Sequence, residues 1–468
     1  MNSRSMAMHI LMQVAQQGSH ADVLLSGCFK RQATLDARDR AFITELVYGT
    51  LRWQARLDWI IDRYARMKSA RMALPVRVIL RLATYQLLYL DRVPPSAAVN
   101  EAVKLAKASQ PLYIVRFVNA VLRSIAANRD ALRDALSEKS TPERWAVAFS
   151  FPGWLIEKWL AELGQQETEA FCRSSNEVAP TTIRVNTLKT TVTELARVLG
   201  ARGFKVTPGR FSPEAIHLDN IRTDLSSLPE YLRGEFQVQD EAAQLVSHLV
   251  APQPGERILD ACAGLGGKST HLGQLMKNEG RLTAMDKQGW RLNHLQENAR
   301  RLQISCIDTK EVDLLEMGAA HPWLASFDRI LLDAPCSGLG VLRRKPDIKW
   351  KINKKDLRRL QRTQLALLAA VAPMVRPGGL LVYATCTVSR EENEAVVQEF
   401  LGCHADFCQE AAVSALPRQS REVVDENGNL RTWPHKHGID GFFAVRLRRA
   451  ARHPARLHQG ALQWKASL

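Results

Sequence analysis

The strongest constraint on the fold is an alternation of short β-prone runs and helical segments that begins near residue 236. Alternating strands and helices are typical of a doubly wound α/β sheet, and such sheets bind ligands where their strands end. We therefore predict a doubly wound domain in this region and expect its functional residues at the strand tips. The predicted strands are residues 256–260, 281–285, 307–312, 328–332, 379–384 and 441–447.

The first 135 residues have a different pattern and are predicted to be all-helical. Apolar side chains recur there at helical spacing, as in Leu57, Ile60 and Ile61, and glycine is rare. Between the two regions, residues 181–186 are strand-like and predict a small α+β subdomain. The chain is thus predicted to be a multidomain α and α/β protein with four parts: a helical domain (1–135), a linker with the small α+β subdomain (136–235), the doubly wound domain (236–449) and a basic tail (450–468).

The composition points to a nucleic-acid partner inside the cell. The 468 residues include 64 Lys and Arg against 48 Asp and Glu, a formal net charge of +16, which predicts a polyanionic partner. The 8 cysteines are scattered through a long chain, so a reducing compartment fits better than a disulfide scaffold. No apolar run of membrane-spanning length and no secretory signal is present, so we expect a cytoplasmic protein.

A glycine-rich turn follows the first predicted strand of the alternating region. Residues 262–268 read Cys-Ala-Gly-Leu-Gly-Gly-Lys. The turn is not a phosphate-binding P-loop, because Cys262 stands where that motif needs its first glycine. It is not a dinucleotide-binding fingerprint either, because Ser269 stands where that motif needs its third glycine. What remains is a turn whose glycines let the backbone approach a ligand.

Aspartates follow the next three predicted strands. The spacing from Gly264 to Asp286 suits a carboxylate that holds a ribose hydroxyl. Asp313 is placed to accept a hydrogen bond from an adenine amine, and Asp333 completes the ring of acids. Any one of these acids is equally well explained as a helix cap or a solvated loop residue. Together with the glycine turn, three acids at strand tips indicate a nucleotide-like cofactor.

Two cysteines follow predicted strands in the same way. Cys336 lies in Asp-Ala-Pro-Cys-Ser-Gly (333–338), and Cys386 lies in Ala-Thr-Cys-Thr (384–387). Free cysteine is often only a small buried hydrophobe. A thiol facing a nucleotide-like methyl donor, however, is what methylation of C5 of a pyrimidine requires, because a thiolate that adds to C6 makes C5 electron-rich. Composition and spacing do not say which of the two cysteines attacks.

Residues 343–362 contain ten basic side chains directly after the Cys336 loop. Such a run is usually a solvated helix face, but its position beside the expected site favours contact with phosphates. Phosphate contacts give affinity without sequence choice. The residues predicted to contact RNA are Arg343, Arg344, Lys345, Lys354, Lys355, Arg358 and Arg359.

These motifs resemble those of the RNA 5-methylcytosine methyltransferases of the Nol/Nop/Sun group, and within it the bacterial enzymes that methylate small-subunit (16S) ribosomal RNA. The helical N-terminus is similar to the NusB-like RNA-binding domain of that subgroup. The resemblance covers most of the chain and implies a Rossmann-like methyltransferase domain. It rests on residues 38–40, 99–103, 117–123, 184–189, 234–242, 333–338, 343–350, 383–387, 392–394 and 440–443.

The resemblance implies S-adenosylmethionine as the cofactor and assigns the two thiols. Cys386 is then the nucleophile, and Cys336 assists release of the product. Where the family usually has Ala-Pro, this chain has Gly264 and Leu265, so the turn lacks a rigid proline. The cofactor-binding residues implied by the resemblance are Cys262, Ala263, Gly264, Leu265, Gly266, Gly267, Lys268, Asp286, Asp313 and Asp333.

We therefore predict a cytosine-C5 methyltransferase that acts on small-subunit ribosomal RNA through a covalent cysteine–C6 adduct, as a monomer without a membrane or metal partner. The alternative enzymatic interpretation is a DNA cytosine methyltransferase, which would attack with the Pro-Cys cysteine and would not need a NusB-like domain. The alternative interpretation from a non-enzymatic class is an RNA-binding ribosome-assembly factor with a dormant catalytic fold. Cys403, His404 and Cys408 have side chains that bind metals, but they lack a second ligand pair.

Overall fold

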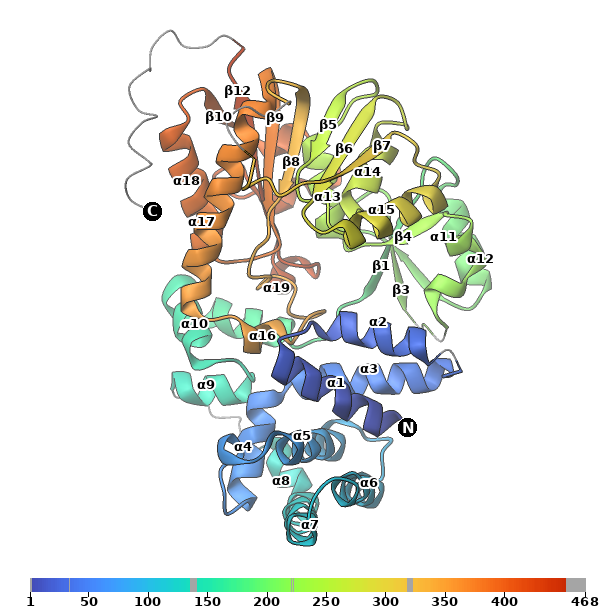
Figure 1. Ribbon diagram of the computed structural model, residues 1–468, viewed down its shortest axis with the longest axis vertical. Coiled ribbons are helices and arrows are strands. Elements are labelled where there is room, and N and C mark those ends of the chain that lie inside the picture. Colours follow the sequence, from blue (N-terminus) through green and yellow to red (C-terminus); the bar gives the residue numbers. More distant parts are fainter. Residues whose placement is uncertain are drawn as a thin grey trace. The chain divides into compact units, whose positions relative to one another are not determined.

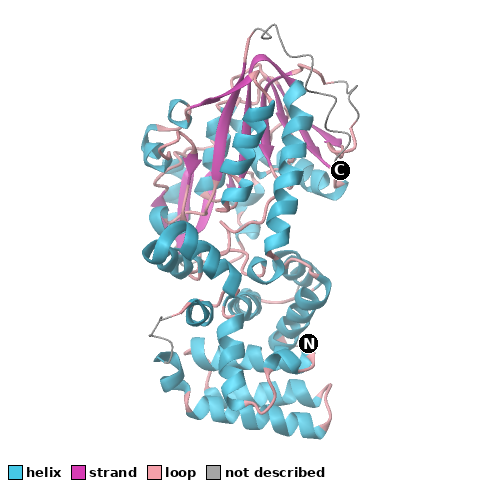
Figure 2. Cartoon of the chain, turned by 90° about the vertical axis from the view of Figure 1, so that its left-hand side faces the viewer, coloured by secondary structure: helices cyan, strands magenta, loops and turns pink. Residues whose placement is uncertain are grey.

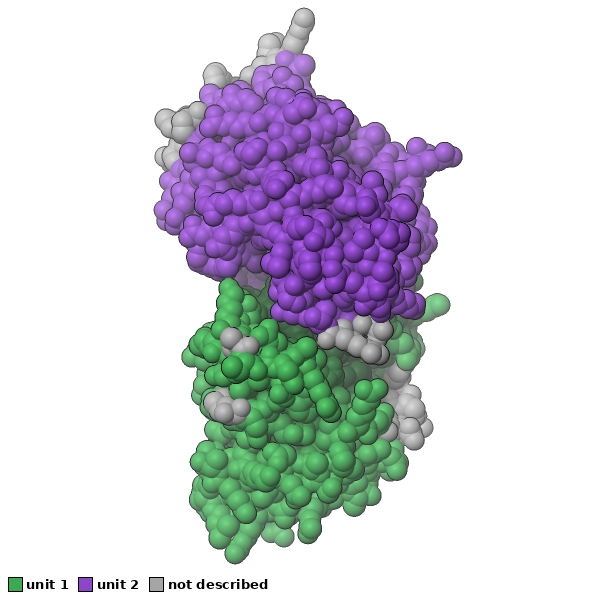
Figure 3. All heavy atoms as spheres, turned by 90° about the vertical axis from the view of Figure 1, so that its right-hand side faces the viewer, with its two compact units in different colours: residues 1–179, 341–354 green, residues 180–340, 355–468 purple. Residues whose placement is uncertain are grey.

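The chain folds into two compact units, which Figure 3 shows in different colours. Unit 1 contains residues 1–179 and 341–354, and unit 2 contains residues 180–340 and those from 355 onward. Among the described residues, strands occur only in unit 2 (Figure 2). The computed structural model describes residues 2–32, 34–134, 141–219, 221, 223–317 and 323–451, so the predicted domain boundary at 135 and residues 452–468 of the predicted tail lie outside it.

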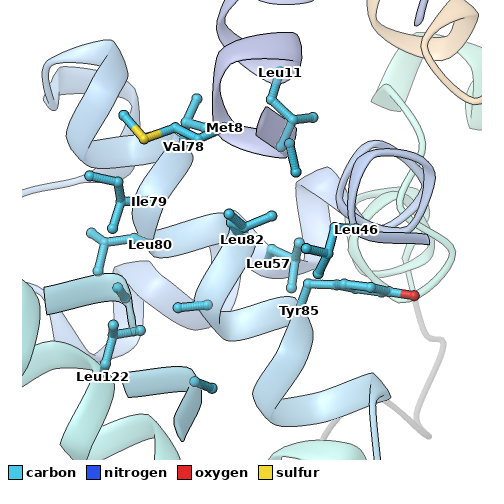
Figure 4. Packing of buried hydrophobic residues seen from close by; sticks show 14 of the residues in the cluster. Met8, Leu11, Leu46, Leu57, Val78, Ile79, Leu80, Leu82, Tyr85 and Leu122 are labelled. Atoms are coloured by element: carbon cyan, nitrogen blue, oxygen red, sulfur yellow. The ribbon is translucent and has the colours of Figure 1, made fainter. Parts of the chain in front are cut away.

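The described part of unit 1 is built from helices alone, which confirms the all-helical prediction for the N-terminal region. The helices are α1 (Ser3–Gln17), α2 (Ala21–Arg31), α3 (Ala37–Arg52), α4 (Gln54–Tyr64), α5 (Leu74–Tyr89), α6 (Pro95–Lys107), α7 (Leu112–Ala127), α8 (Arg129–Asp134), α9 (Pro142–Ala148), α10 (Gly153–Ser175) and α16 (Ile348–Lys351). Val78, Leu82 and Tyr85 of α5 share one buried apolar cluster with Leu11 of α1 and Leu46 of α3 (Figure 4). Each large aliphatic side chain in such a core contributes about 1.5–3 kcal/mol.

The segment 341–354 belongs to unit 1, although the residues before and after it belong to unit 2. Trp350 of α16 donates a hydrogen bond from Nε1 to the carbonyl oxygen of Leu51 at 2.7 Å, and its ring packs against the apolar core of unit 1. The chain therefore leaves unit 2 after Gly340, packs among the helices of unit 1, and returns to unit 2 at Lys355.

Unit 2 begins with a four-stranded antiparallel sheet in the order β2-β3-β1-β4. Its elements are β1 (Thr181–Val185), α11 (Val192–Ala201), β2 (Lys205–Pro208), β3 (Ala215–Asp219), α12 (Pro229–Leu232) and β4 (Phe236–Val238). Ile183 of β1 pairs with Ile216 of β3 on one side and with Val238 of β4 on the other. The prediction of β1 is confirmed, whereas β4 has only 3 residues, too few to show an alternating pattern. Because β4 pairs with β1, this sheet extends past the predicted limit at 235.

The larger sheet has the order β10-β12-β9-β8-β5-β6-β7, with β11 paired to β12 (Figure 1). Its strands are β5 (Arg257–Asp260), β6 (Arg281–Asp286), β7 (Ile307–Glu311), β8 (Phe327–Asp333), β9 (Val375–Thr385), β10 (Phe407–Glu410), β11 (Leu430–Arg431) and β12 (Phe443–Arg449). Strands β5 to β9 run parallel, β12 pairs antiparallel with β9, and β10 and β11 each pair antiparallel with β12. The chain moves from β5 outward to β6 and β7 and then returns to β8 on the other side of β5. This reversal confirms the doubly wound prediction and marks the edge where such sheets bind ligands.

Helices cover both faces of the larger sheet. They are α13 (Glu241–Val250), α14 (Gly267–Leu275), α15 (Gly289–Leu302), α17 (Lys354–Val371) and α18 (Glu394–Cys403). On one face, Leu368 of α17 and Phe400 of α18 share a buried cluster with Ile330, Leu332 and Tyr383 of β8 and β9. On the other face, α13 packs against β8, β9 and β12, and α14 against β6 and β7. No helix in the described ranges is both long enough and apolar enough to cross a membrane.

Candidate active site

The turn after β5 brings backbone amides to the carboxyl edge of the larger sheet. Gly264 and Gly266 have φ angles of 55° and 82°, in the left-handed region that side chains rarely adopt. A Cβ on Gly266 would lie 2.3 Å from Cγ of Leu295, so close packing also requires glycine there. Helix α14 begins at Gly267, and the free amides of a helix start favour an electronegative ligand group. Burial raises the pKa of Cys262, which starts the turn, so this side chain remains a thiol.

The predicted carboxylate at the end of β6 is joined to this turn. Asp286 accepts a hydrogen bond from the backbone amide of Gly264 at 3.0 Å and from that of Gln288 at 2.9 Å. An ionised carboxylate has further lone pairs, so it can still accept from a ligand hydroxyl. Asp313 follows β7 and accepts from the backbone amide of Leu315 at 3.0 Å. The Asp286 carboxylate therefore orders the glycine turn, whereas Asp313 orders its own loop.

A partly buried ion pair lies beside the turn. Lys268 donates to Oδ2 of Asp333 at 2.6 Å. Burial alone would lower the pKa of Lys268, but Asp333 outweighs burial and raises it, so the ammonium group keeps its charge. Asp260, at the end of β5, accepts from Oγ of Ser269 at 2.6 Å, and burial raises the pKa of Asp260 to about 7. The site thus holds one fixed positive charge and one carboxyl group that binds a proton near neutral pH.

The two predicted cysteines are in contact. The Sγ atoms of Cys336 and Cys386 lie 3.3 Å apart. The hydrogen bond with Cys386, together with burial and the nearby carboxylates of Glu392 and Asp333, raises the pKa of Cys336 well above its usual range. Ionisation of Cys336 is therefore disfavoured. Lys268 is close enough to Cys386 to interact with its charge, and a neighbouring cation favours the thiolate form.

A buried glutamate that was not predicted as a site residue connects the two cysteine loops. Glu392 accepts from the backbone amide of Ser337 at 2.8 Å and from Nε2 of Gln364 at 3.1 Å. The hydroxyl groups of Ser337 and Thr387 also donate to its carboxylate. Because Ser337 follows Cys336 and Thr387 follows Cys386, one carboxylate fixes the position of both loops. The available signal was the position of residues 392–394 just after the Thr-Cys motif.

Backbone contacts hold the same loops at close range. The amide of Gly340 donates to the carbonyl oxygen of Cys386 at 3.0 Å, and the amide of Gly441 donates to the carbonyl oxygen of Gly340 at 2.8 Å. A Cβ on Gly340 would lie 1.9 Å from the carbonyl oxygen of Gly441, so no other residue fits without moving the backbone. The Cys336 loop, the Cys386 loop and the segment before β12 therefore meet at one place.

Comparison with known proteins matches this architecture. Residues 247–448 match the family described as 16S rRNA methyltransferase RsmB/F, residues 1–127 match the NusB family, and residues 151–223 match the ferredoxin-like domain of RsmF/B-like methyltransferases. The probable ribosomal RNA small subunit methyltransferase B of Synechocystis sp. is 37% identical over 449 residues, which are 96% of this chain and 100% of the relative. The chain belongs to the ribosomal RNA small subunit methyltransferase B family.

Other relatives and solved structures support this assignment. The probable methyltransferase B of Bacillus subtilis is 36% identical over 447 residues, covering 95% of this chain and 98% of the relative. The structure of PH0851 has a TM-score of 0.79 at 26% identity and covers 96% of this chain and 99% of that one. A methyltransferase homolog from Pyrococcus horikoshii has a TM-score of 0.57 at 26% identity, covering 67% and 100%. Membership in the methyltransferase B family confirms the NusB-like and Rossmann-like predictions and S-adenosylmethionine as the cofactor.

In this member of the methyltransferase B family, the basic run 343–362 has two parts. The first belongs to segment 341–354 of unit 1, and the second lies on helix α17. Arg343, which belongs to unit 1, is only 4% exposed, so little of its side chain is available to the predicted phosphate contact. Lys345 lies 2.9 Å from the Asp22 carboxylate and remains partly exposed, as does Arg344. The remaining predicted contacts, on α17, are exposed as a phosphate contact requires: Lys354, Lys355, Arg358 and Arg359.

Lys349, within the basic run 343–362, is not part of a solvated helix face. Its side chain is fully buried and donates to the carbonyl oxygens of Arg52 and Ser150, each at 3.3 Å, and to Oδ1 of Asn176 at 2.5 Å. Burial lowers the pKa of Lys349 well below its usual range. The lysine therefore holds segment 341–354 within unit 1 and is not available to RNA.

Proposed function

We propose that the protein methylates C5 of a cytosine in small-subunit ribosomal RNA through a covalent adduct with Cys386. The observation that carries the proposal is the pair of thiols 3.3 Å apart at the carboxyl edge of the sheet. Attack on C6 needs one thiol, and a second thiol in contact with it serves the separate task of releasing the product. The names of the relatives support ribosomal RNA of the small subunit as the substrate. We infer that the enzyme works as a monomer in the cytoplasm.

The residues at the edge of the sheet fit the cofactor. S-adenosylmethionine, when bound, supplies an electrophilic methyl group. We assign its contacts to the backbone of residues 262–268, to Asp286 for the ribose hydroxyls and to Asp313 for the adenine amine. Asp333, held by Lys268, closes the site from β8. A Cβ on Gly264 would meet no atom within 4 Å, so this side of the turn is open to a ligand.

The chain's own residues then divide the reaction into steps. The Cys386 thiolate adds to C6, so that C5 gains the electron density needed to take the methyl group. A base removes the proton from C5, the bond between C6 and sulfur breaks, and Cys386 leaves as a thiolate. Cys336 assists this release. The target cytosine must leave its stack to reach the thiol, so we expect a flipped or single-stranded base.

Product analysis tests the proposal. Purified protein is incubated with small-subunit ribosomal RNA and S-adenosylmethionine carrying a labelled methyl group, and the digested RNA is analysed by mass spectrometry. We expect labelled 5-methylcytidine at one position. A single-stranded DNA of the same sequence serves as the matched substrate. Methylation of the DNA instead of the RNA would favour a DNA methyltransferase, and RNA binding without methylation would favour an assembly factor.

Reversal of the exposed charges on α17 is expected to weaken RNA binding and to flatten its dependence on salt. Removal of one phosphate-binding cation lowers the slope of log affinity against log salt by about 0.7–0.9. The measurement is fluorescence anisotropy with labelled RNA at several salt concentrations, and cofactor binding is expected to stay unchanged. The substitutions are Lys354→Glu, Lys355→Glu, Arg358→Glu and Arg359→Glu.

A matched control separates a local effect from that of net charge alone. Four other basic residues of unit 2 are also largely exposed, with 46% to 74% of each side chain accessible. Reversing them changes the net charge of the chain by the same amount. If both sets weaken RNA binding equally, α17 makes no specific contact with RNA. The control residues are Lys205, Arg233, Arg281 and Lys310.

A further inference from the structure

Three side chains that are far apart in the sequence converge inside unit 2. Glu214 directly precedes β3, His248 lies on α13, and His271 lies on α14. One ligand atom from each lies within 4.8 Å of the others, and the described part of the chain contains one such group. The separations along the chain are too long for a recognisable metal-binding motif, so no sequence pattern indicates this cluster.

The hydrogen bonds within this cluster leave one member without a partner. Glu214 accepts from Nε2 of His248 at 2.8 Å and from Oγ of Ser212 at 3.1 Å. His271 is 0% exposed, and neither of its ring nitrogens has a hydrogen-bond partner among the described residues. A buried imidazole without a partner costs free energy, because it has given up its bonds to water. Its ring stands at 87° to that of His248, with the ring centroids 5.2 Å apart.

We propose that Glu214, His248 and His271 bind one divalent transition-metal ion of the zinc class. Two imidazoles and one carboxylate are a ligand set that Zn²⁺ accepts, and an ion among them would satisfy the unpartnered nitrogen of His271. Ligand atoms of a tetrahedral Zn²⁺ lie about 3.3 Å apart, since each bond is about 2.0–2.2 Å long. The 2.8 Å contact between Glu214 and His248 therefore has to open by a few tenths of an ångström.

The position of the cluster indicates a structural role for the ion. His271 is fully buried and Glu214 is 8% exposed, so a substrate cannot reach the ion directly. The ion would connect the four-stranded sheet, through Glu214, to α13 and α14, which cover the larger sheet. Helix α14 begins at the glycine turn, and His271 lies one helical turn after Gly267. Metal binding would thus fix the helix that carries the turn assigned to the cofactor.

The positive charge of the neighbouring Arg184 is expected to weaken the binding of a metal ion to the cluster. Its guanidinium group donates to the carbonyl oxygen of Gly267 at 2.7 Å and to Oγ1 of Thr270 at 3.1 Å. Its positive charge acts on both Glu214 and His271 and opposes a cation between them. Only one carboxylate in the cluster offsets this charge. We expect the ion to bind more weakly than in a structural site with four protein ligands.

The test uses the full chain and does not depend on methyl transfer. Protein stripped of metal is titrated with Co²⁺, followed by its visible absorption, and with Zn²⁺, followed by thermal unfolding. The titration is repeated in a Cys336→Ala/Cys386→Ala background, because the thiol pair is the obvious competing ligand. We expect one equivalent of Co²⁺ whose spectrum lacks a thiolate charge-transfer band in that background, and a higher unfolding midpoint with Zn²⁺.

Substitutions in the cluster decide the assignment. Glu214→Gln and His248→Gln keep the approximate size of each side chain and are each expected to weaken Co²⁺ binding at least tenfold and to abolish the Zn²⁺-dependent rise in the midpoint. His294→Gln is the control, since this histidine is 41% exposed on α15. Circular dichroism shows whether each variant is folded. Absence of saturable binding to the parent protein, or equal binding by a folded Glu214→Gln variant, would overturn the proposal.

Discussion

Cys386→Ala is expected to lower the rate of methyl transfer by roughly three orders of magnitude or more, because without this thiolate no bond to C6 forms. The same variant is expected to form no covalent complex with RNA that carries 5-fluorocytosine at the target position. In the unmodified protein that complex persists, since fluorine cannot be removed as the C5 proton is. A denaturing gel of protein incubated with RNA and S-adenosylmethionine measures the complex directly.

Cys336→Ala is expected to have the opposite phenotype on the same gel. The variant still attacks C6 and methylates C5, but it releases the product slowly, so a protein–RNA complex accumulates even with ordinary cytosine. Cys408→Ala, which removes an exposed thiol on β10, is the control and is expected to behave like the parent protein. A complex with Cys386→Ala and none with Cys336→Ala would reverse the two roles and favour attack from the Pro-Cys loop, as in the DNA-type alternative.

Glu392→Ala is expected to lower methyl transfer roughly 100-fold while leaving cofactor binding nearly unchanged. Displacement of reacting groups by about 1 Å is enough for a loss of this size. The substitution leaves the amide of Ser337 and Nε2 of Gln364 without this acceptor, and each buried donor left unpaired costs about 1–3 kcal/mol of stability. Single-turnover rates, isothermal titration with S-adenosylmethionine and chemical unfolding measure the three quantities separately.

Glu392→Gln distinguishes a positioning role from a purely structural one. Burial raises the pKa of Glu392 above its usual range, so folding shifts the equilibrium of this side chain toward the protonated acid, which glutamine resembles. We expect the glutamine variant to keep most of the activity that the alanine variant loses. Glu399→Ala, on the exposed side of α18, is the matched control. Equal losses in Glu392→Ala and Glu392→Gln would show that the loops need the ionised carboxylate and not only its hydrogen bonds.

The raised pKa also predicts the direction of a pH effect on stability. The folded protein holds the proton of Glu392 more tightly than the unfolded chain does. The resulting stabilisation is complete below the pKa of an unfolded glutamate and is lost as the pH rises through the folded-state pKa. Glu392→Gln cannot ionise, so the difference in unfolding free energy between the two proteins is expected to shift in favour of the variant as the pH rises.

The location of the site could be predicted because parallel strands end at one edge of a sheet. Gly264, Asp286 and Asp333 each lie in or just after a run that is recognisable as a strand from its apolar β-prone residues. Once those runs are strands of one doubly wound sheet, their tips must be neighbours. The structure shows this directly: Gly264 donates to Asp286, and the Cys336 and Cys386 thiols touch.

What could not be predicted depends on partners that are remote in the sequence. Glu392 contacts Ser337, which is 55 residues away, and no local pattern encodes that distance. A positive charge likewise does not reveal whether a side chain is exposed. Lys349 is buried because Arg52, Ser150 and Asn176 supply oxygen atoms to its ammonium group, and those oxygens come from distant parts of unit 1. The same limit applies to Arg343, whose burial the sequence does not indicate.

Segment 341–354 of the helical unit is covalently continuous with the Cys336 loop of unit 2. The polypeptide crosses between the units three times, at 179/180, 340/341 and 354/355. One crossing directly follows Gly340, whose amide donates a hydrogen bond to the carbonyl oxygen of Cys386. A protein shortened to residues 180–468 would keep α16 but would lose Leu51, Arg52 and Asn176, the groups that receive its indole and ammonium donors. The N-terminal domain therefore supplies the hydrogen-bond acceptors of a segment that directly continues the Cys336 loop along the chain.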